Sequence, residues 1–225
     1  MESNDSINTN TTQLLQGIRL PTIRRFPRYL RTLRELKAQG EENVSSDYLA
    51  RILKTEPIVV RKDMAFTGIT GKPRIGFNIS ELIEAIEKLI NFQNHSNAFL
   101  VGAGSLGAAL LGYQGFEDHG LNILAAFDTD PQKIGTEIHE KSVLSLEKLK
   151  SLVQRMNVHI GILAVPKEVA QGVADLMIDA GIRGIWNFTP AELKVPANVV
   201  VQREDMASGL AVLAVNLERM MNEES

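Results

Sequence analysis

A glycine-rich turn between two apolar segments is the feature that most limits what this chain can fold into. The turn follows the apolar segment 97–101, opens the apolar segment 106–111, and consists of Gly102, Ala103, Gly104, Ser105, Leu106 and Gly107. Glycines at this spacing permit a tight turn, close approach of a pyrophosphate to the backbone and close packing of a helix on a strand. The N-terminus of the following helix offers unpaired N–H donors to the anion. Although such turns also arise by chance, this context predicts a doubly wound α/β domain that binds a dinucleotide.

A carboxylate at the end of the next apolar segment strengthens this prediction. Residues 122–127 read as a buried strand, and Asp128 follows it. In dinucleotide-binding sheets a carboxylate about twenty residues after the glycine turn accepts hydrogen bonds from the adenosine ribose. It would repel a 2′-phosphate, and the nearest basic residue, Lys133, lies several positions further along, so NAD(H) is favoured over NADP(H). The alternative is that Asp128 is only a turn residue or a helix cap.

Later apolar segments complete the predicted parallel sheet, which we place over residues 81–204. The nearly continuous apolar run 159–165 is typical of a strand buried on both faces. Val165 and Pro166 stand at its carboxyl end, the edge of such sheets where ligands bind. A helix over 171–180 and strands over 184–187 and 199–202 follow.

Composition excludes several classes of protein. The chain has 225 residues, 44% of them hydrophobic, and no cysteine, which rules out disulfides and thiolate metal or redox chemistry. It has no apolar run near the roughly 18 to 20 residues that span a bilayer. Residues 1–16 are polar and lack the basic and apolar regions of a signal peptide, so we expect a disordered tail on a cytoplasmic protein.

Charge divides the chain into two parts. Residues 1–79 hold 13 Lys and Arg against 8 Asp and Glu, whereas residues 80–225 hold 11 against 19. The net charges of +5 and −8 give the overall −3. A basic segment in an acidic protein points to contact with nucleic acid, although a solvated basic face would have the same composition.

The basic part has the pattern of a helix-turn-helix. Apolar residues over 26–36 keep a helical period, and Gly40 provides a stop. A short helix over 47–53 follows, with its apolar face on Leu49, Ile52 and Leu53 and serines available as N-caps. Pro57 suits the first turn of a third helix that runs to about residue 64. In such motifs this last helix enters the major groove, and here it presents Arg61 and Lys62.

Residues 66–79 predict a β-hairpin. Glycines recur in this segment, and apolar and polar residues alternate from 75 to 79. Its tip carries Lys72 and Arg74, which would lie against a phosphate backbone or a minor groove. Three helices and a hairpin make a winged-helix domain over residues 17–80. Each basic residue taken alone could equally be a surface charge.

Beyond these generic motifs, the chain contains two specific sequences, Arg61-Lys62-Asp63 and Asn187-Phe188-Thr189-Pro190. They belong to a larger set of segments that covers nearly everything after the tail, at 24–31, 44–46, 60–63, 71–78, 102–113, 127–131, 180–190 and 204–206. In these segments the chain resembles the Rex family of redox-sensing transcriptional repressors.

The resemblance implies a homodimer that binds operator DNA through the winged helix and NAD(H) through the Rossmann domain, with NADH causing release from DNA. It implies DNA contacts by basic and hydroxyl side chains at Ser46, Arg61, Lys62, Lys72 and Arg74. It implies that the dinucleotide site is lined by Gly102, Ala103, Gly104, Ser105, Leu106, Gly107, Asp128, Val165, Pro166, Asn187 and Phe188. Tyr113 and Asp205 resemble a pair that hydrogen-bonds between subunits in the NADH-bound form.

The C-terminal segment 205–225 predicts an amphipathic helix. Its apolar stripe runs from Met206 to Met221, a pattern more often explained by packing on the helix's own domain. The resemblance instead implies a dimerisation helix exchanged between subunits.

Departures from the family pattern fall at functional positions. Glu56 brings a carboxylate close to the expected DNA surface, and residues 64–67 differ at the exit of the recognition helix. Ser105 stands where many members have Arg or Asn, and Met206 where an aromatic residue is common.

Two other functions remain as alternatives. A dehydrogenase would need an acid or base beside the nicotinamide and usually a substrate domain. The four histidines, at 95, 119, 139 and 159, read as surface or strand-start residues, and no metal-ligand spacing or Ser/His/Asp grouping is present. A regulatory module that binds CoA or another adenine nucleotide is the second alternative.

Overall fold

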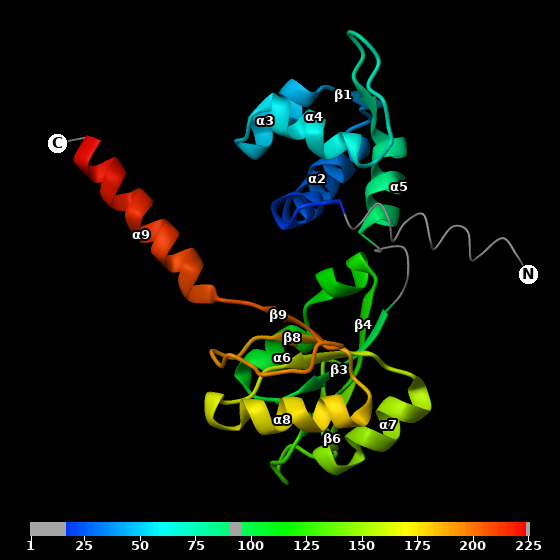
Figure 1. The fold of residues 1–225 in the computed structure, drawn as a ribbon, viewed down its shortest axis with the longest axis vertical. Helices are drawn as coiled ribbons and strands as arrows, with labels where there is room; N and C mark the ends of the chain where they lie inside the picture. The colour runs from blue at the N-terminus through cyan, green and yellow to red at the C-terminus, as the bar shows by residue number, and fades with distance from the viewer. Residues whose placement is uncertain (1–16, 91–95, 224–225) are drawn as a thin grey trace, which may run out of the picture. The chain divides into compact units, whose positions relative to one another are not determined.

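The chain folds into two compact units, residues 1–94 and residues 95–225 (Figure 1). The computed structural model describes residues 17–90 and 96–223. The tail expected over residues 1–16 lies outside this part of the chain.

Within residues 17–90, the first unit contains four helices around one core. They are α2 (Leu20–Ala38), α3 (Ser46–Leu53), α4 (Pro57–Ala65) and α5 (Ile79–Leu89). The hydroxyl of Ser45 accepts a hydrogen bond from the Tyr48 N–H at the start of α3, and Lys54 ends that helix in the left-handed region at φ 50°. Pro57 occupies the first turn of α4. The helix-turn-helix predicted from the sequence is present as α3 and α4, although Ile52 is 44% exposed rather than part of the apolar face of α3.

The segment predicted as a hairpin forms less strand than expected. Only Phe77–Asn78 (β2) is a strand, and it pairs antiparallel with Asn43–Val44 (β1) instead of within the segment. The tip closes between Lys72 and Gly76, whose backbone groups exchange two hydrogen bonds of 2.8 and 2.9 Å. Gly76 has φ +94°, and a side chain there would collide with the Val44 carbonyl, so the chain must turn at a glycine. The wing is therefore a short turn.

The boundary between the units lies later than the sequence suggested. We placed it after residue 80, whereas the structure divides the chain after Asn94. The reason is α5, because Leu82, Ile86 and Leu89 are buried in the same core as the helix-turn-helix. This helix belongs to the first unit and not to the sheet.

The second unit is a seven-stranded sheet in the order β5-β6-β4-β3-β7-β8-β9. All neighbouring strands are parallel except β5 and β6. The strands are β3 (Ser96–Val101), β4 (Leu121–Asp128), β5 (Glu137–Ile138), β6 (Lys141–Ser145), β7 (Ile160–Leu163), β8 (Gly184–Asn187) and β9 (Val200–Arg203). This arrangement confirms the predicted doubly wound parallel sheet. The β5–β6 hairpin was missed, since His139 and Glu140 turn with positive φ and no glycine marks the turn.

Helices cover both faces of this sheet. Helix α6 (Ser105–Leu111) packs on one face with Ala98 and Leu100 of β3. Helices α7 (Leu149–Met156) and α8 (Lys167–Ala180) pack on the other with Phe99 and Val101. Short 3₁₀ helices, η1 (Gln114–His119) and η2 (Leu146–Lys148), lie in two of the connections. The strand order reverses direction between β3 and β7, which in doubly wound folds creates a ligand crevice at the carboxyl ends.

The last helix is α9 (Met206–Glu223). Every residue from 207 to 222 is exposed. The exposed residues include large apolar side chains, among them Leu210 at 66% and Leu213 at 62% exposure. The sequence pattern favoured packing on the helix's own domain, and the structure does not contain that packing.

Candidate dinucleotide site and nucleic-acid interface

Each of the three glycines in the turn after β3 is needed for a different physical reason. Gly102 has φ +103°, and a side chain there would collide with the Ala164 carbonyl. A side chain on Gly107 would collide with the Gly102 carbonyl, so this glycine lets α6 approach β3. Gly104 is exposed, and a Cβ built on it meets no atom within 4 Å. The first and third glycines are thus required by the fold, whereas the second keeps a space open where a pyrophosphate approaches in this fold class.

Asp128 at the end of β4 is tied to this turn. Its Oδ2 accepts a 2.9 Å hydrogen bond from the Ala103 N–H, and its Oδ1 accepts one of 2.9 Å from the Asp130 N–H. The Lys133 ammonium lies 3.1 Å from Oδ2. Partial burial opposes ionisation, but the bonds from Asp130, Lys133 and Ala103 outweigh it and hold the pKa of Asp128 below its ordinary value. The basic residue that seemed distant in the sequence therefore contacts the carboxylate directly.

The remaining residues expected at the crevice separate into two groups. Val165 and Pro166 follow β7, and the Val165 side chain lies 2.9 Å from where a Gly102 Cβ would stand. Phe188, after β8, is partly exposed. Asn187 is fully buried, donates to the Ala191 carbonyl at 2.9 Å and accepts from the Thr189 N–H at 2.9 Å. Its amide shapes the loop after β8, a role that the sequence pattern did not reveal.

At the start of α6, Ser105 is exposed and Leu106 is partly buried beside the glycines. The backbone of this turn therefore faces solvent between Gly104 and Ser105. The donor set suits an anionic diphosphate, and Asp128 suits a ribose diol.

Within one chain, Tyr113 and Asp205 have different partners and do not hydrogen-bond to each other. Tyr113 is 59% exposed, and its ring packs on Phe116 with ring centroids 4.8 Å apart. Asp205 is exposed and accepts hydrogen bonds of 3.0 Å from the Ser208 hydroxyl and the Ala207 N–H. The bond from Ser208, followed by that from Ala207, lowers the pKa of Asp205. In this state Asp205 caps the start of α9.

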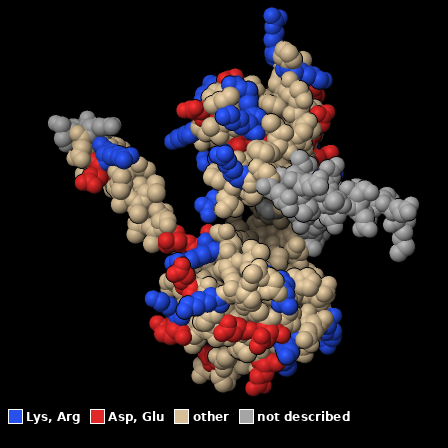
Figure 2. Space-filling view, in the orientation of Figure 1, with Lys and Arg blue, Asp and Glu red and all other residues tan. Residues whose placement is uncertain are grey.

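The helix-turn-helix unit presents its cations to solvent. Arg61 and Lys62 on α4 and Lys72 and Arg74 on the wing are all exposed. Arg61 also donates to the Ser46 hydroxyl at 3.3 Å, which joins the two helices of the motif. Figure 2 shows Lys and Arg side chains gathered over α3 and α4 and at the wing tip, whereas both signs of charge are interspersed on the second unit.

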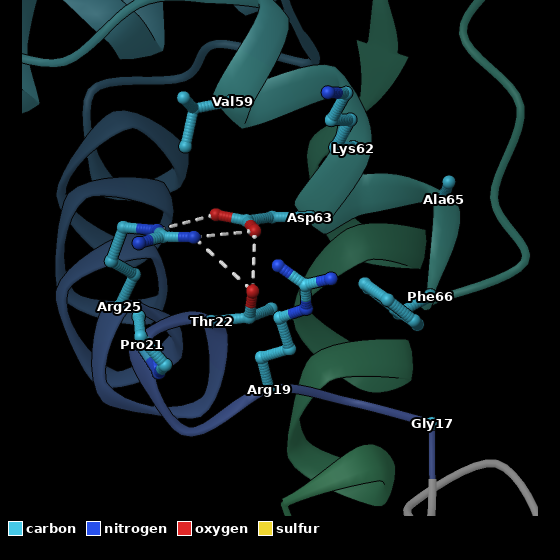
Figure 3. A pocket seen from close by; sticks show the side chains of 10 residues that line it. All are labelled: Gly17, Arg19, Pro21, Thr22, Arg25, Val59, Lys62, Asp63, Ala65 and Phe66. Atoms are coloured by element: carbon cyan, nitrogen blue, oxygen red, sulfur yellow. Dashed lines mark hydrogen bonds and ion pairs between the residues drawn. The ribbon is translucent and has the colours of Figure 1, made fainter.

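A buried carboxylate on α4 holds this helix in place, and the sequence analysis missed it. Asp63 is 2% exposed and accepts hydrogen bonds from Arg25 (2.6 and 2.8 Å), Thr22 (2.9 Å) and Tyr29 (2.8 Å), all on α2. Figure 3 shows Thr22 and Arg25 directed at this carboxylate. The signal in the sequence was an acid between Val60 and Met64, both on the buried side of an otherwise basic helix.

A groove of about 550 Å³ borders this network between the start of α2 and α4 (Figure 3). Arg19 and Lys62 line it together with apolar residues that include Val59 and Phe66. Lys62 and the buried carboxylate of Asp63, adjacent on α4, thus line the same groove.

Comparison with known proteins agrees with this two-part arrangement. Residues 18–65 match the family described as "Putative DNA-binding protein N-terminus", and residues 93–191 match the family described as "CoA binding domain". The redox-sensing transcriptional repressor Rex of Treponema denticola is 48% identical over 90% of this chain and 94% of its own length. The chain belongs to the Rex family. The Rex protein of Carboxydothermus hydrogenoformans is 41% identical over 91% of this chain and all of its own length.

Solved Rex structures have the same fold. The Rex-family repressor RSP, crystallised with β-NAD⁺ and operator DNA, superposes with a TM-score of 0.83 at 32% identity, covering 92% of this chain and 95% of RSP. Its complex with β-NADH superposes with a TM-score of 0.82, also at 32% identity, covering 93% of this chain and 99% of RSP. Because Rex relatives are repressors, the family assignment decides against the dehydrogenase alternative.

Metal sites and membrane spans are both absent from the part of the chain that the structure describes. No group of His, Asp or Glu side chains there is arranged to hold a metal ion. No helix within those residues is long and apolar enough to span a membrane.

Proposed function

We propose that this Rex protein represses transcription by binding operator DNA, and that NADH binding at the Rossmann domain releases it. One observation carries the proposal: the chain combines an exposed basic helix-turn-helix with a glycine turn whose Gly104 faces open space next to Asp128. The two RSP complexes support both halves, since one contains NAD⁺ with operator DNA and the other NADH.

The proposed DNA surface is made of side chains from α3, α4 and the wing. Arg61 and Lys62 would face the major groove, with Arg61 oriented by Ser46 at 3.3 Å. Lys72 and Arg74 would contact phosphates from the wing. In a dimer, two copies of α4 would meet palindromic half-sites about one helical turn apart.

The proposed dinucleotide surface lies at the carboxyl edge between β3 and β7. Backbone of the glycine turn, with Ser105 and Leu106 at the start of α6, would hold the pyrophosphate, and Asp128 the adenosine ribose. Val165, Pro166 and Phe188 would line the remainder, and Asn187 would set the shape of that loop from beneath. Asp128 disfavours a 2′-phosphate, and it equally disfavours the 3′-phosphate of CoA, which counts against the CoA alternative despite the match to that domain family.

We further propose that α9 is the dimer contact and that Tyr113 pairs with Asp205 of the partner subunit when NADH is bound. The exposure of every residue from 207 to 222 supports the first part, because so many exposed apolar side chains on one helix are unusual in a monomer. The exposure of Tyr113 supports the second. A repressor of this kind acts in the compartment that holds the chromosome, which in bacteria is the cytoplasm.

The mechanism is thermodynamic linkage. If NADH binds best to a dimer whose two α4 helices no longer match the half-site spacing, operator and NADH weaken each other's binding by the same factor. Typical coupling of about 1 to 3 kcal/mol corresponds to a factor of roughly 5 to 150.

The test is a fluorescence-anisotropy titration of a palindromic duplex at fixed salt, repeated with saturating NAD⁺, NADH or CoA. We expect specific binding that NADH weakens and that NAD⁺ and CoA do not. Binding indifferent to both dinucleotides, or weakened by CoA alone, would refute the proposal. Arg61→Ala should weaken operator binding by about 1 to 3 kcal/mol without changing NADH affinity, while the control Arg155→Ala on α7 should change neither.

The latch has its own test in the same assay. Tyr113→Phe keeps the ring that packs on Phe116 and removes the hydroxyl. It should reduce the response to NADH while sparing operator binding in its absence. An unchanged response would remove Tyr113 from the latch.

A further inference from the structure

Four aromatic rings form a continuous chain on the α6 face of the sheet. The ring centroids of Tyr113 and Phe116 are 4.8 Å apart, those of Phe116 and Trp186 are 5.2 Å apart, and those of Trp186 and Phe188 are 5.0 Å apart. The pairs are tilted or edge-on, the arrangements that aromatic rings prefer. This chain runs from the loop after β8 to the loop after α6.

A hydrogen bond connects the same chain to the start of α9. The Trp186 indole N–H donates to the Glu204 carboxylate at 2.9 Å. Glu204 is the residue immediately before Asp205, and its own N–H donates to the Asn187 carbonyl at 2.9 Å. Glu204, two residues before α9, is thus fixed to β8 by one backbone bond and one side-chain bond.

These contacts meet at one residue. Trp186 touches Phe116, which supports the Tyr113 ring, and it also holds Glu204, which precedes Asp205. On its other side it packs on Phe188, at the edge proposed to hold the dinucleotide.

We infer that Trp186 is a positioning residue that sets both halves of the subunit latch, Tyr113 through Phe116 and Asp205 through Glu204. This inference rests on the proposed function. A dinucleotide that shifts Phe188 would shift the indole packed on it, and both halves of the latch would move together. Neither Trp186 nor Glu204 is proposed to touch the ligand or the DNA.

Tight packing around Tyr113 makes its position sensitive to such shifts. A Cβ built on Gly115 would stand 2.7 Å from the ring and hydroxyl of Tyr113. The tyrosine ring therefore lies directly on the backbone at Gly115 and has Phe116 against its face or edge. We therefore expect a movement of Phe116 to change the position of the Tyr113 ring.

The main experiment compares Glu204→Leu, which removes the acceptor for the indole, with Glu204→Gln, which keeps an acceptor oxygen. For each protein the operator Kd is measured with and without saturating NADH, and the NADH Kd is measured without DNA. We expect Glu204→Leu to reduce the NADH effect on operator affinity at least fivefold while the operator Kd without NADH stays within about twofold of the wild type. Because the two ligands are linked, the NADH Kd without DNA should rise by the same factor by which the effect falls. Glu204→Gln should restore most of the effect. An effect unchanged in Glu204→Leu would overturn the inference.

Substitutions of the donor of this hydrogen bond, Trp186, give a second, independent set of variants. Trp186→Phe keeps a ring between Phe116 and Phe188 but lacks the N–H donor, so it should reproduce Glu204→Leu. The double variant should be no worse than either single variant, since both remove the same bond. Additive losses would show that the two residues act separately and would contradict the inference. Phe116→Leu interrupts the other arm and should weaken the NADH effect even with Trp186 and Glu204 intact.

Spectroscopy separates positioning from a loss of folding. Trp186 is the chain's single tryptophan, so acrylamide quenching of its emission reports the exposure of this one indole. We expect NADH to change the quenching constant more than NAD⁺ does in the wild type, and this difference to disappear in Phe116→Leu. If NADH fails to release the wild-type protein from DNA, the proposed function fails. If the wild type responds and every variant responds equally, only the role of Trp186 fails.

Discussion

The two ligand surfaces of this protein are built in opposite ways. The dinucleotide turn of the second unit is made of backbone, and its glycines are needed because side chains would collide with the carbonyls of Ala164 and Gly102 or fill the space at Gly104. The proposed DNA surface of the first unit is made of long cationic side chains on α4, and a buried carboxylate on the helix's other face fixes it to α2. A backbone site depends on steric room, whereas a side-chain surface depends on how its helix is anchored.

The largest expected effect tests the anchor of α4. Asp63→Ala would leave Arg25 and the Tyr29 hydroxyl without their partner in a site where Asp63 is 2% exposed. Breaking a buried ion pair from one side costs about 3 to 5 kcal/mol. We expect a loss of this size in urea unfolding of the first unit, loss of operator binding and unchanged NADH binding.

A second ion pair of the same unit provides the control. Arg34 and Glu87 lie 2.8 Å apart but are 39% and 21% exposed. Glu87→Gln should therefore cost only about 0.2 to 1 kcal/mol. Equal losses for the two substitutions would show that the buried network does not anchor α4.

The next effect tests the backbone site with two alanines three residues apart. Gly107→Ala forces a side chain onto the Gly102 carbonyl, so it should destabilise the second unit by about 1 to 3 kcal/mol and abolish NADH binding. Gly104→Ala meets nothing within 4 Å and should leave the melting temperature unchanged. It should still weaken NADH binding at least tenfold in a titration, because its methyl group enters the space kept for the ligand. Tight NADH binding by Gly104→Ala would place the ligand elsewhere.

A smaller effect concerns the carboxylate that ties β4 to the glycine turn. Hydrogen bonds lower the pKa of Asp128, so the folded protein binds fewer protons than the unfolded chain near the ordinary Asp pKa of about 4. The stabilisation is complete above that pH and is lost as the pH falls through the lower, folded-state pKa. Thermal unfolding between pH 7 and 3 should show this loss, and Asp128→Asn should lower stability at pH 7 by about 1 kcal/mol and flatten the profile. The exposed Asp118→Asn is the control and should leave the profile as steep as before.

The smallest effect concerns Glu56, which precedes α4 without making a side-chain capping bond. Glu56→Ser supplies a residue preferred at helix N-caps and removes a negative charge from the proposed DNA surface. We expect operator affinity to rise about two- to fivefold in low salt, with a smaller gain at high salt because the charge is screened. A fall in affinity at low salt would place Glu56 away from the phosphates.

The difference between the two surfaces also explains how far the sequence could predict them. Helices α3 and α4 and the strands β3, β4 and β8 lie close to their expected bounds, because apolar period and glycine position are local signals. Pairings between distant side chains leave no such signal. The contacts of Asp63 with α2, of Lys133 with Asp128 and of Asn187 with its own loop became visible only in the fold. The exposure of α9 could not be predicted either, because an apolar stripe on a helix does not indicate which surface packs against it.

The proposed DNA contacts and the proposed dimer contacts lie in different units, and this separation has a genetic consequence. Helix α9 belongs to the second unit, while the helix-turn-helix and the Asp63 network belong to the first. A chain with a damaged first unit would still pair with an intact chain, and the mixed dimer would hold only one half-site. Such alleles are expected to be dominant over the wild type in a cell that makes both proteins. Alleles that remove the apolar side chains of α9 would leave the intact chains to pair with each other, and we expect them to be recessive.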